Sequence, residues 1–174
     1  MKPSLRCIEL IKQFEGIRDG DPQTVNLDPY LCPADVATIG WGHAITYLGK
    51  QLRGRAGLRQ AQAIYPYGIT MQEAEDLLYE DVAEKALEVE SLLKDVQPTQ
   101  GEFDALVSFA YNIGTDIDDD EIAEGLGDST LLKKYLRGDI NGAADEFGKW
   151  VFSGGKRLRG LERRRAAERE LFLS

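Results

Sequence analysis

The sequence predicts an α+β fold in which a small mixed N-terminal lobe, residues 1–69, precedes a larger helical lobe, residues 70–174. Residues 16–35 are rich in Gly, Pro and Asp, which favours turns, and residues 36–41 are the β-branched and aromatic kinds typical of a short strand. From residue 70 onward, apolar residues recur at helical spacing. We therefore expect one domain of 174 residues, with a short β-sheet in the first lobe and a cleft between the lobes.

The first lobe is expected to begin with an amphipathic helix. Ser4 can cap this helix, and Gly16 is a natural stop for a helix that ends near Glu15. Its apolar residues share one face: Leu5, Ile8, Ile11 and Phe14. Residues 47–66 carry arginines among glycines and are expected to form an extended loop with a helical turn.

Two capping boxes open the long helices of the second lobe. Thr70–Glu73 starts a partly amphipathic helix that is expected to reach about Val96. Pro98 breaks this helix, Thr99–Glu102 starts the next one, and Gly114 closes it.

Shorter helices are expected in the last third of the chain. Ser129 can cap a helix that Gly138 ends, and a short segment follows over residues 139–150. After Gly154–Gly155, a basic helix is expected to run to about Phe172.

The charge and composition exclude several classes of protein. The net charge of −9 disfavours general nucleic-acid binding and gives no long-range attraction to anionic cell-wall polymers. No apolar run approaches the roughly 18 residues of a membrane helix, and residues 1–11 are too broken by charge for a signal peptide. We therefore expect synthesis in a cytoplasm. That compartment argues against a required disulfide, although a Cys7–Cys32 bridge stays open.

Residues that could carry chemistry fall in three motifs of the first lobe. They are Phe14–Glu15–Gly16, Tyr30–Leu31–Cys32–Pro33–Ala34 and Thr38–Ile39–Gly40–Trp41–Gly42–His43. A single Glu at a helix end is far more often a solvated charge than an acid catalyst. In this combination and order, however, the motifs resemble the signature of the phage-type lysozymes, which form glycoside hydrolase family 24.

The second lobe carries weaker motifs that resemble the same family in the same order. They are Leu106–Gly114, Ser129–Leu132, Trp150, Gly154–Gly155, Gly160–Leu161, Arg163–Arg164 and Glu168–Arg169. The resemblance covers nearly the whole chain, and it implies a lysozyme-like fold.

Cleavage of a glycosidic bond needs a proton donor on one side and usually a base or nucleophile on the other. The resemblance implies that Glu15 is the general acid and that Thr38 helps to place the attacking water. At the position of Cys32 the family has Asp or Cys. Five residues separate Cys32 from Thr38, as in the family, whereas the segment from Glu15 to Cys32 is longer, as though residues 19–26 were inserted.

Cys32 leaves the identity of the water-assisting group open. A thiol is neutral below its normal pKa, so it replaces a carboxylate poorly unless it is activated, and it can orient water without deprotonating it. Asp28 and Asp35 are possible substitutes. The preferred interpretation of Asp35 is a solvated turn residue.

The resemblance also implies that Tyr111, Asn112 and Thr130 contact sugar or line the cleft, and helix packing with capping explains them equally well. His43, the single histidine, is expected to be structural rather than a general base. Two aromatic residues are assigned to the core first: Trp41 and Trp150.

No metal or cofactor is expected. The acidic loop 115–128 alternates Asp116, Asp118 and Asp120 but lacks the Gly and Glu that a calcium loop needs at its sixth and twelfth positions. The basic run 156–169 is expected to form a solvated helix with paired glutamates. Contact with peptide-stem carboxylates or anionic lipid is its functional alternative.

The implied reaction is hydrolysis of the β-1,4 bond between N-acetylmuramic acid and N-acetylglucosamine in peptidoglycan, as by a phage or prophage endolysin. We expect a monomer that is made in the bacterial cytoplasm, is released through a partner's membrane hole and acts on the wall in the periplasm. Three alternatives stay open: a lytic transglycosylase, a catalytically inactive peptidoglycan-binding or inhibitor-like module on the same fold, and a nucleic-acid binder that uses the basic C-terminal helix.

Overall fold

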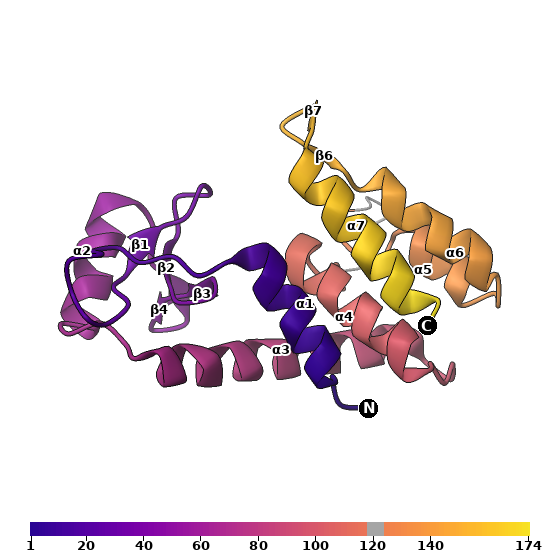
Figure 1. Ribbon diagram of the computed structural model, residues 1–174, viewed down its shortest axis with the longest axis horizontal. Helices are drawn as coiled ribbons and strands as arrows, with labels where there is room; N and C mark the ends of the chain where they lie inside the picture. The colour runs from indigo at the N-terminus through magenta and orange to yellow at the C-terminus, as the bar shows by residue number, and fades with distance from the viewer. Residues whose placement is uncertain (118–123) are drawn as a thin grey trace. The chain divides into compact units, whose positions relative to one another are not determined.

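The computed structural model describes residues 1–117 and 124–174 (Figure 1). The described chain combines helices with small antiparallel sheets, which confirms the α+β class. Its internal contacts group into two compact units. Unit 1 comprises Met1–Phe14 and Val82–Ser174, and unit 2 comprises Glu15–Asp81. None of the described helices is long and apolar enough to cross a membrane.

Unit 2 contains all the strands of the N-terminal half. β1, β2 and β3 form an antiparallel sheet in that order, and β4 pairs with β5 as a separate hairpin. The bounds are β1 Tyr30–Leu31, β2 Ala37–Ile39, β3 His43–Ala44, β4 Thr46–Tyr47, β5 Lys50–Gln51 and α2 Gly54–Ile64. The expectation of a loop over residues 47–66 was wrong, because α2 alone has 11 residues. The glycines and arginines obscured its helical pattern.

The core of unit 2 lies where the sheet meets α2 and the start of α3 (Met71–Leu93). Its buried members are Ala37, Ile39, Ile45, Leu52, Ala61, Ile69 and Ala74. The predicted capping box at Thr70 is confirmed. Its hydroxyl accepts from the Glu73 N–H at 3.2 Å, and the Glu73 carboxylate accepts from the Thr70 N–H at 2.7 Å. The α3 helix ends at Leu93, three residues short of the expected end at Val96.

Unit 1 is helical and is built around α4 (Gln100–Ile113), which packs against α7 (Arg159–Phe172). The second capping box is also confirmed, since Thr99 and Glu102 exchange side-chain and backbone hydrogen bonds. A Cβ atom at Gly101 would lie 2.5 Å from the Leu171 carbonyl oxygen, so only glycine allows this approach of α4 to α7. The shorter elements are α5 Thr130–Tyr135, α6 Ile140–Glu146, the 3₁₀ helix η1 Phe147–Lys149, β6 Phe152–Ser153 and β7 Lys156–Arg157.

The first helix, α1 (Leu5–Glu15), packs with the helices of unit 1 through polar as well as apolar contacts. The Ser4 N–H donates to the Asp104 carboxylate at 2.9 Å, and the Cys7 thiol donates to the Asp104 carbonyl at 3.4 Å. These bonds explain why residues 1–14 group with the C-terminal helices. The Cys7 and Cys32 side chains are both free thiols.

A buried ionic cluster joins α7 to α4. Glu168 is 0% exposed and accepts from Arg164 at 3.0 Å and from the Ser108 hydroxyl at 2.9 Å. Its second carboxylate oxygen lies 2.8 Å from the Arg165 guanidinium, which also lies over the Phe109 ring. Because each charge faces an opposite charge or a hydrogen-bonding group, the cluster is tolerated inside unit 1.

Candidate active site

The antiparallel sheet of unit 2 brings two of the expected catalytic residues together. Thr38 lies opposite Tyr30 in the register of β1 and β2, and Cys32 follows two residues after Tyr30. Side chains two residues apart in an extended segment point to the same face, as do directly opposite residues of paired strands. Tyr30, Cys32 and Thr38 therefore share one face of the sheet.

A tight turn between β1 and β2 fixes the Cys32–Thr38 pair. The Cys32 N–H donates to the Val36 carbonyl at 2.9 Å, and the Thr38 hydroxyl donates to that same carbonyl at 3.0 Å. The turn closes through the Asp35 N–H, which donates to the Cys32 carbonyl at 2.9 Å. Asp35 takes a φ of 61°, a conformation that Asp tolerates better than most residues. Its exposed side chain fits the interpretation as a solvated turn residue.

The surroundings of Cys32 favour its thiolate. Burial acts to raise the pKa of the thiol, but the backbone N–H groups of residues 34 and 36, the Thr38 hydroxyl and the Arg53 charge all lower it. The lowering effects prevail, so the pKa of Cys32 lies below its ordinary value. In Cys7, by contrast, burial and the Asp104 charge raise the pKa. The two cysteines therefore differ in chemistry as well as in exposure.

Glu15 is the last residue of α1, and its side chain is half-buried. It lies close enough to Tyr30 for its charge to affect the phenol. Burial raises the pKa of Tyr30 most, and the negative charges of Cys32 and Glu15 raise it further, against the opposing effect of Arg18. The charges of both expected catalytic groups, Glu15 and Cys32, thus raise the pKa of Tyr30.

Sequence reasoning did not single out Tyr30. The signal was present, because a tyrosine two residues before Cys32 in an extended segment must share its face. The other possible substitute for Cys32, Asp28, is engaged in the loop between α1 and β1: it accepts from the Thr24 hydroxyl, and its N–H donates to Asp19 at 2.9 Å.

His43 at the start of β3 contacts Asp81 on α3. Its Nδ1 lies 2.9 Å and 3.1 Å from the two carboxylate oxygens. This pair ties the sheet to α3 within unit 2. Trp41 packs against the core of unit 2, and the Trp150 ring meets the Phe109 ring edge-on at 5.5 Å in unit 1.

The expected sugar-contacting residues all lie in unit 1. Tyr111 and Asn112 are in the last turn of α4, and the Asn112 side-chain oxygen accepts a hydrogen bond from Arg165. Thr130 is the exposed first residue of α5, directly after the Ser129 cap. Asn112 thus has a structural role in the ionic cluster, whatever else it contacts.

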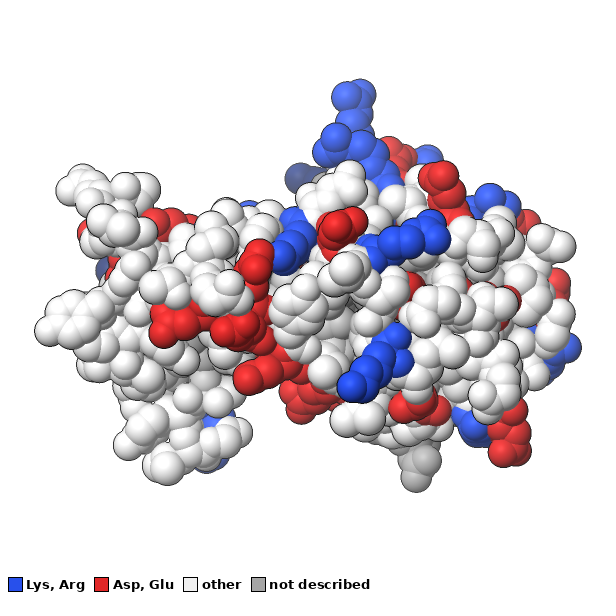
Figure 2. All heavy atoms as spheres, turned by 60° about the horizontal axis from the view of Figure 1, so that its bottom comes forward, with Lys and Arg blue, Asp and Glu red and all other residues white. Residues whose placement is uncertain are grey.

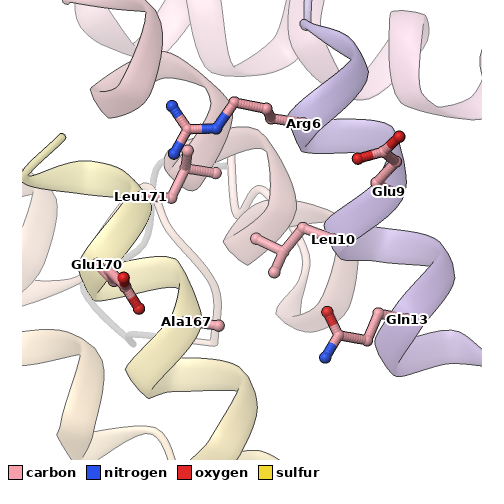
Figure 3. Close-up of a pocket in the computed structure, with 7 residues that line it drawn as sticks. All are labelled: Arg6, Glu9, Leu10, Gln13, Ala167, Glu170 and Leu171. Carbon is pink, nitrogen blue, oxygen red and sulfur yellow. The ribbon is translucent and has the colours of Figure 1, made fainter.

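A surface hollow of about 260 Å³ lies between α1 and α7 in unit 1 (Figure 3). Its lining residues are Arg6, Glu9, Leu10, Gln13, Ala167, Glu170 and Leu171. None of the expected catalytic or sugar-contacting residues is among them, so we assign it no catalytic role.

Within residues 1–117 and 124–174, no three His, Cys, Asp or Glu side chains come together in a way that could hold a metal ion. Asp118 and Asp120 of the aspartate alternation lie outside the described residues. The Asp116 carboxylate accepts from the backbone N–H groups of residues 124 and 125, at 3.1 and 3.0 Å.

Comparison with known proteins gives matches along the whole chain. The model of the phage lysozyme family matches residues 12–168. An endolysin of Bacillus phage B103 is 40% identical over 175 residues, covering 100% of this chain and 55% of that endolysin. The chain spans about half the length of this relative and of a second Bacillus phage endolysin.

Two solved structures share the fold over nearly all of both chains. The endolysin from Escherichia coli O157:H7 phage FAHEc1 has a TM-score of 0.72 at 31% identity, covering 100% of this chain and 94% of that one. The muramidase domain of SpmX from Asticaccaulis excentricus has a TM-score of 0.71 at 30% identity, covering 99% and 98%.

Proposed function

Because the chain belongs to the phage lysozyme family, we propose that it is a muramidase of the endolysin type, which hydrolyses the β-1,4 bond between N-acetylmuramic acid and N-acetylglucosamine in peptidoglycan. The observation that carries the proposal is the shared face of Tyr30, Cys32 and Thr38, with Glu15 near the same tyrosine. A proton donor and a water-holding pair are the two parts that glycosidic hydrolysis requires.

In the proposed mechanism, Glu15 donates its proton to the glycosidic oxygen as the bond to the anomeric carbon breaks. Cys32 and Thr38 hold the water that attacks this carbon. As the new C–O bond forms, this water loses a proton to solvent, and Glu15 is reprotonated from solvent for the next turnover. The Thr38 hydroxyl is oriented by the Val36 carbonyl. The lowered pKa of Cys32 raises the fraction of thiolate, which accepts a hydrogen bond from that water more strongly than a thiol does. Tyr111, Asn112 and Thr130 are proposed to contact the glycan.

We further propose that the chain acts as a monomer and as a single lysozyme-like domain, with residues 1–69 and 70–174 as its two lobes. It is made in the cytoplasm of a bacterial host and reaches the periplasmic side of the wall through a membrane hole formed by a partner protein. The endolysin names of its relatives support this route.

The test is lysis of outer-membrane-permeabilised Gram-negative cells, together with the masses of the products from purified peptidoglycan. Wild type should release muropeptides with reducing ends, and Glu15→Gln should be inactive. Glu9→Gln is the matched control, because Glu9 is an exposed glutamate on the same helix. Inactive wild type, or an active Glu15→Gln, would contradict the proposal.

The same experiment separates the alternative reactions. Products with a 1,6-anhydro ring would identify a lytic transglycosylase, for which a site with a single glutamate and a cysteine is sufficient. The variants Thr38→Val and Cys32→Ala then test whether these two side chains hold the attacking water. Each should slow hydrolysis while leaving the binding of peptidoglycan intact.

A further inference from the structure

We propose that one projecting end of unit 1 binds the surface of an anionic lipid bilayer. This surface, the basic hairpin tip, consists of Phe152, Lys156, Arg157, Leu158, Arg159 and Arg163. It combines cations, three of which form no ion pair with the described residues, with exposed apolar side chains on one small projection. The proposed hydrolytic reaction uses none of these residues.

The hairpin is a defined structure rather than a loose loop. Phe152 pairs with Arg157, and the strands are joined by Gly154 and Gly155, whose φ angles of 55° and 73° suit a tight two-residue turn. At the base, the Leu158 N–H donates to the carbonyl of buried Val151 at 2.9 Å. The β6–β7 hairpin consequently projects beyond the first turn of α7 (Figure 1).

The tip carries cations that the described parts of the protein do not neutralise. Lys156, Arg159 and Arg163 are exposed and form no ion pair with any residue of 1–117 or 124–174, while Arg157 pairs with Glu162. The side chains of Lys and Arg gather on this projection in Figure 2. The whole chain has a net charge of −9, so the tip is a local exception to its acidic surface. Such a concentration of positive charge is attracted to anionic surfaces.

Apolar exposure on the same projection favours a bilayer over a soluble polyanion. Phe152 is 60% exposed and Leu158 is 42% exposed, and each lies beside cations of the tip. Carboxylates of a wall polymer would be bound by the cations alone. A bilayer would also bury the phenyl group of Phe152 and the isobutyl group of Leu158 in its headgroup region, beside the cations. Interfacial membrane binding combines these two contributions.

The test is sedimentation of the full chain with vesicles, at low salt and in the absence of peptidoglycan. One set of vesicles is an equimolar mixture of phosphatidylglycerol and phosphatidylcholine, and the other is phosphatidylcholine alone. We expect binding to the anionic vesicles, little binding to the neutral ones, and release as salt is added. Equal binding to both sets, or none to either, would overturn the proposal.

Two variants locate the surface. The double variant Arg159→Gln, Arg163→Gln should weaken binding to anionic vesicles roughly 30-fold, at about 1 kcal/mol per cation. Phe152→Ser should weaken it about tenfold or more through the lost apolar burial. Both change exposed side chains, and an unaltered circular dichroism spectrum will confirm that the fold is retained.

The matched control is Arg55→Gln, Arg59→Gln, which removes two exposed arginines at the same helical spacing on α2, outside the tip. This variant should bind the anionic vesicles within about twofold of wild type, since its cations do not belong to the proposed surface. If both double variants lose binding equally, the attraction is general and the basic hairpin tip is not the site. Since no step of the assay depends on peptidoglycan cleavage, failure of the muramidase proposal would leave this result unaffected.

Discussion

Two glutamates of α7 allow a direct test of what burial does to an ion pair. Glu168 is 0% exposed and faces Arg164 and Arg165, which are 3% and 1% exposed. Glu162 is 36% exposed and pairs with Arg157, which is 65% exposed. We predict that Glu168→Gln strongly destabilises unit 1, whereas Glu162→Gln does not. The substitution is the same in both cases and keeps the shape of the side chain.

The expected magnitudes follow from solvation. Neutralising Glu168 removes the carboxylate that the buried guanidinium groups of Arg164 and Arg165 both face, and removal of one partner from a buried ion pair costs about 3–5 kcal/mol of unfolding free energy. When Glu162 is neutralised, water solvates the exposed Arg157 guanidinium instead. Exposed ion pairs contribute only about 0–1 kcal/mol to the free energy of unfolding. For a chain of this size, the melting temperature should fall by about 6–20 °C for Glu168→Gln and by at most about 4 °C for Glu162→Gln.

Tryptophan fluorescence can report on unit 1 alone. Trp150 packs on Phe109 in unit 1 and Trp41 lies in unit 2, so a Trp41→Phe background leaves Trp150 as the single probe. Urea and thermal unfolding of both variants in this background would give the two losses of stability. Losses within about 1 kcal/mol of each other would refute the argument, because they would show that water solvates Glu168 as well as Glu162.

Four further outcomes are expected. Iodoacetamide should alkylate Cys32 and leave Cys7 unmodified in the native protein, as read by peptide mass, because the pKa of Cys32 is lowered and that of buried Cys7 is raised. The Tyr30 phenol is expected to hydrogen-bond the reacting groups. Tyr30→Phe should therefore lower kcat about tenfold and shift the pH dependence of kcat, with little change in melting temperature. An unchanged pH dependence would exclude this role of the phenol. Burial acts to raise the pKa of Glu146, but Lys134 and Lys149 lower it, so the folded-state pKa lies below its ordinary value of 4.5. The ionised glutamate therefore contributes stability above about pH 4.5, and this stability is lost as the pH falls through the lower folded-state pKa. Glu146→Gln should cost about 1–3 kcal/mol of unfolding free energy at neutral pH, and urea titrations should show a smaller loss of stability at acid pH than in wild type. Lysis should hold or rise from low to moderate salt, given the net charge of −9, and a steep loss would point to a binding step that depends on cationic residues.

The sequence predicted the elements whose signals are local. Both capping boxes, the Ser129 cap and the stop at Gly16 depend on contacts between residues a few positions apart, and all of them occur in the structure. The packing of α1 against α4 could not be predicted, because it rests on Asp104, a hundred residues from Ser4. α2 was missed although it is amphipathic, because its buried residues are the small Gly57 and Ala61, which give little apolar signal among the arginines and glycines of this segment.

For the candidate site, sequence motifs identified residue types and order but not their partners. Thr38 lies opposite Tyr30 because of the strand register. This register cannot be predicted until the β1–β2 turn is known. The buried ionic cluster was likewise hidden, since the same sequence pattern of Arg and Glu on α7 fits a solvated helix with paired charges. Asn112 shows the consequence: sugar contact and helix packing explained this motif position equally well, and in the structure its side-chain oxygen accepts a hydrogen bond from Arg165.

The turn at residues 32–36 connects the fold to the proposed chemistry. The Val36 carbonyl accepts from the Cys32 backbone N–H and from the Thr38 hydroxyl, so one carbonyl group holds the Cys32 backbone and sets the direction of the hydroxyl. The backbone N–H groups that turn back toward the sulfur lower the pKa of Cys32, and a lower pKa makes the thiol more suitable for the role proposed for it. A cysteine at this position therefore depends on the turn for its chemistry.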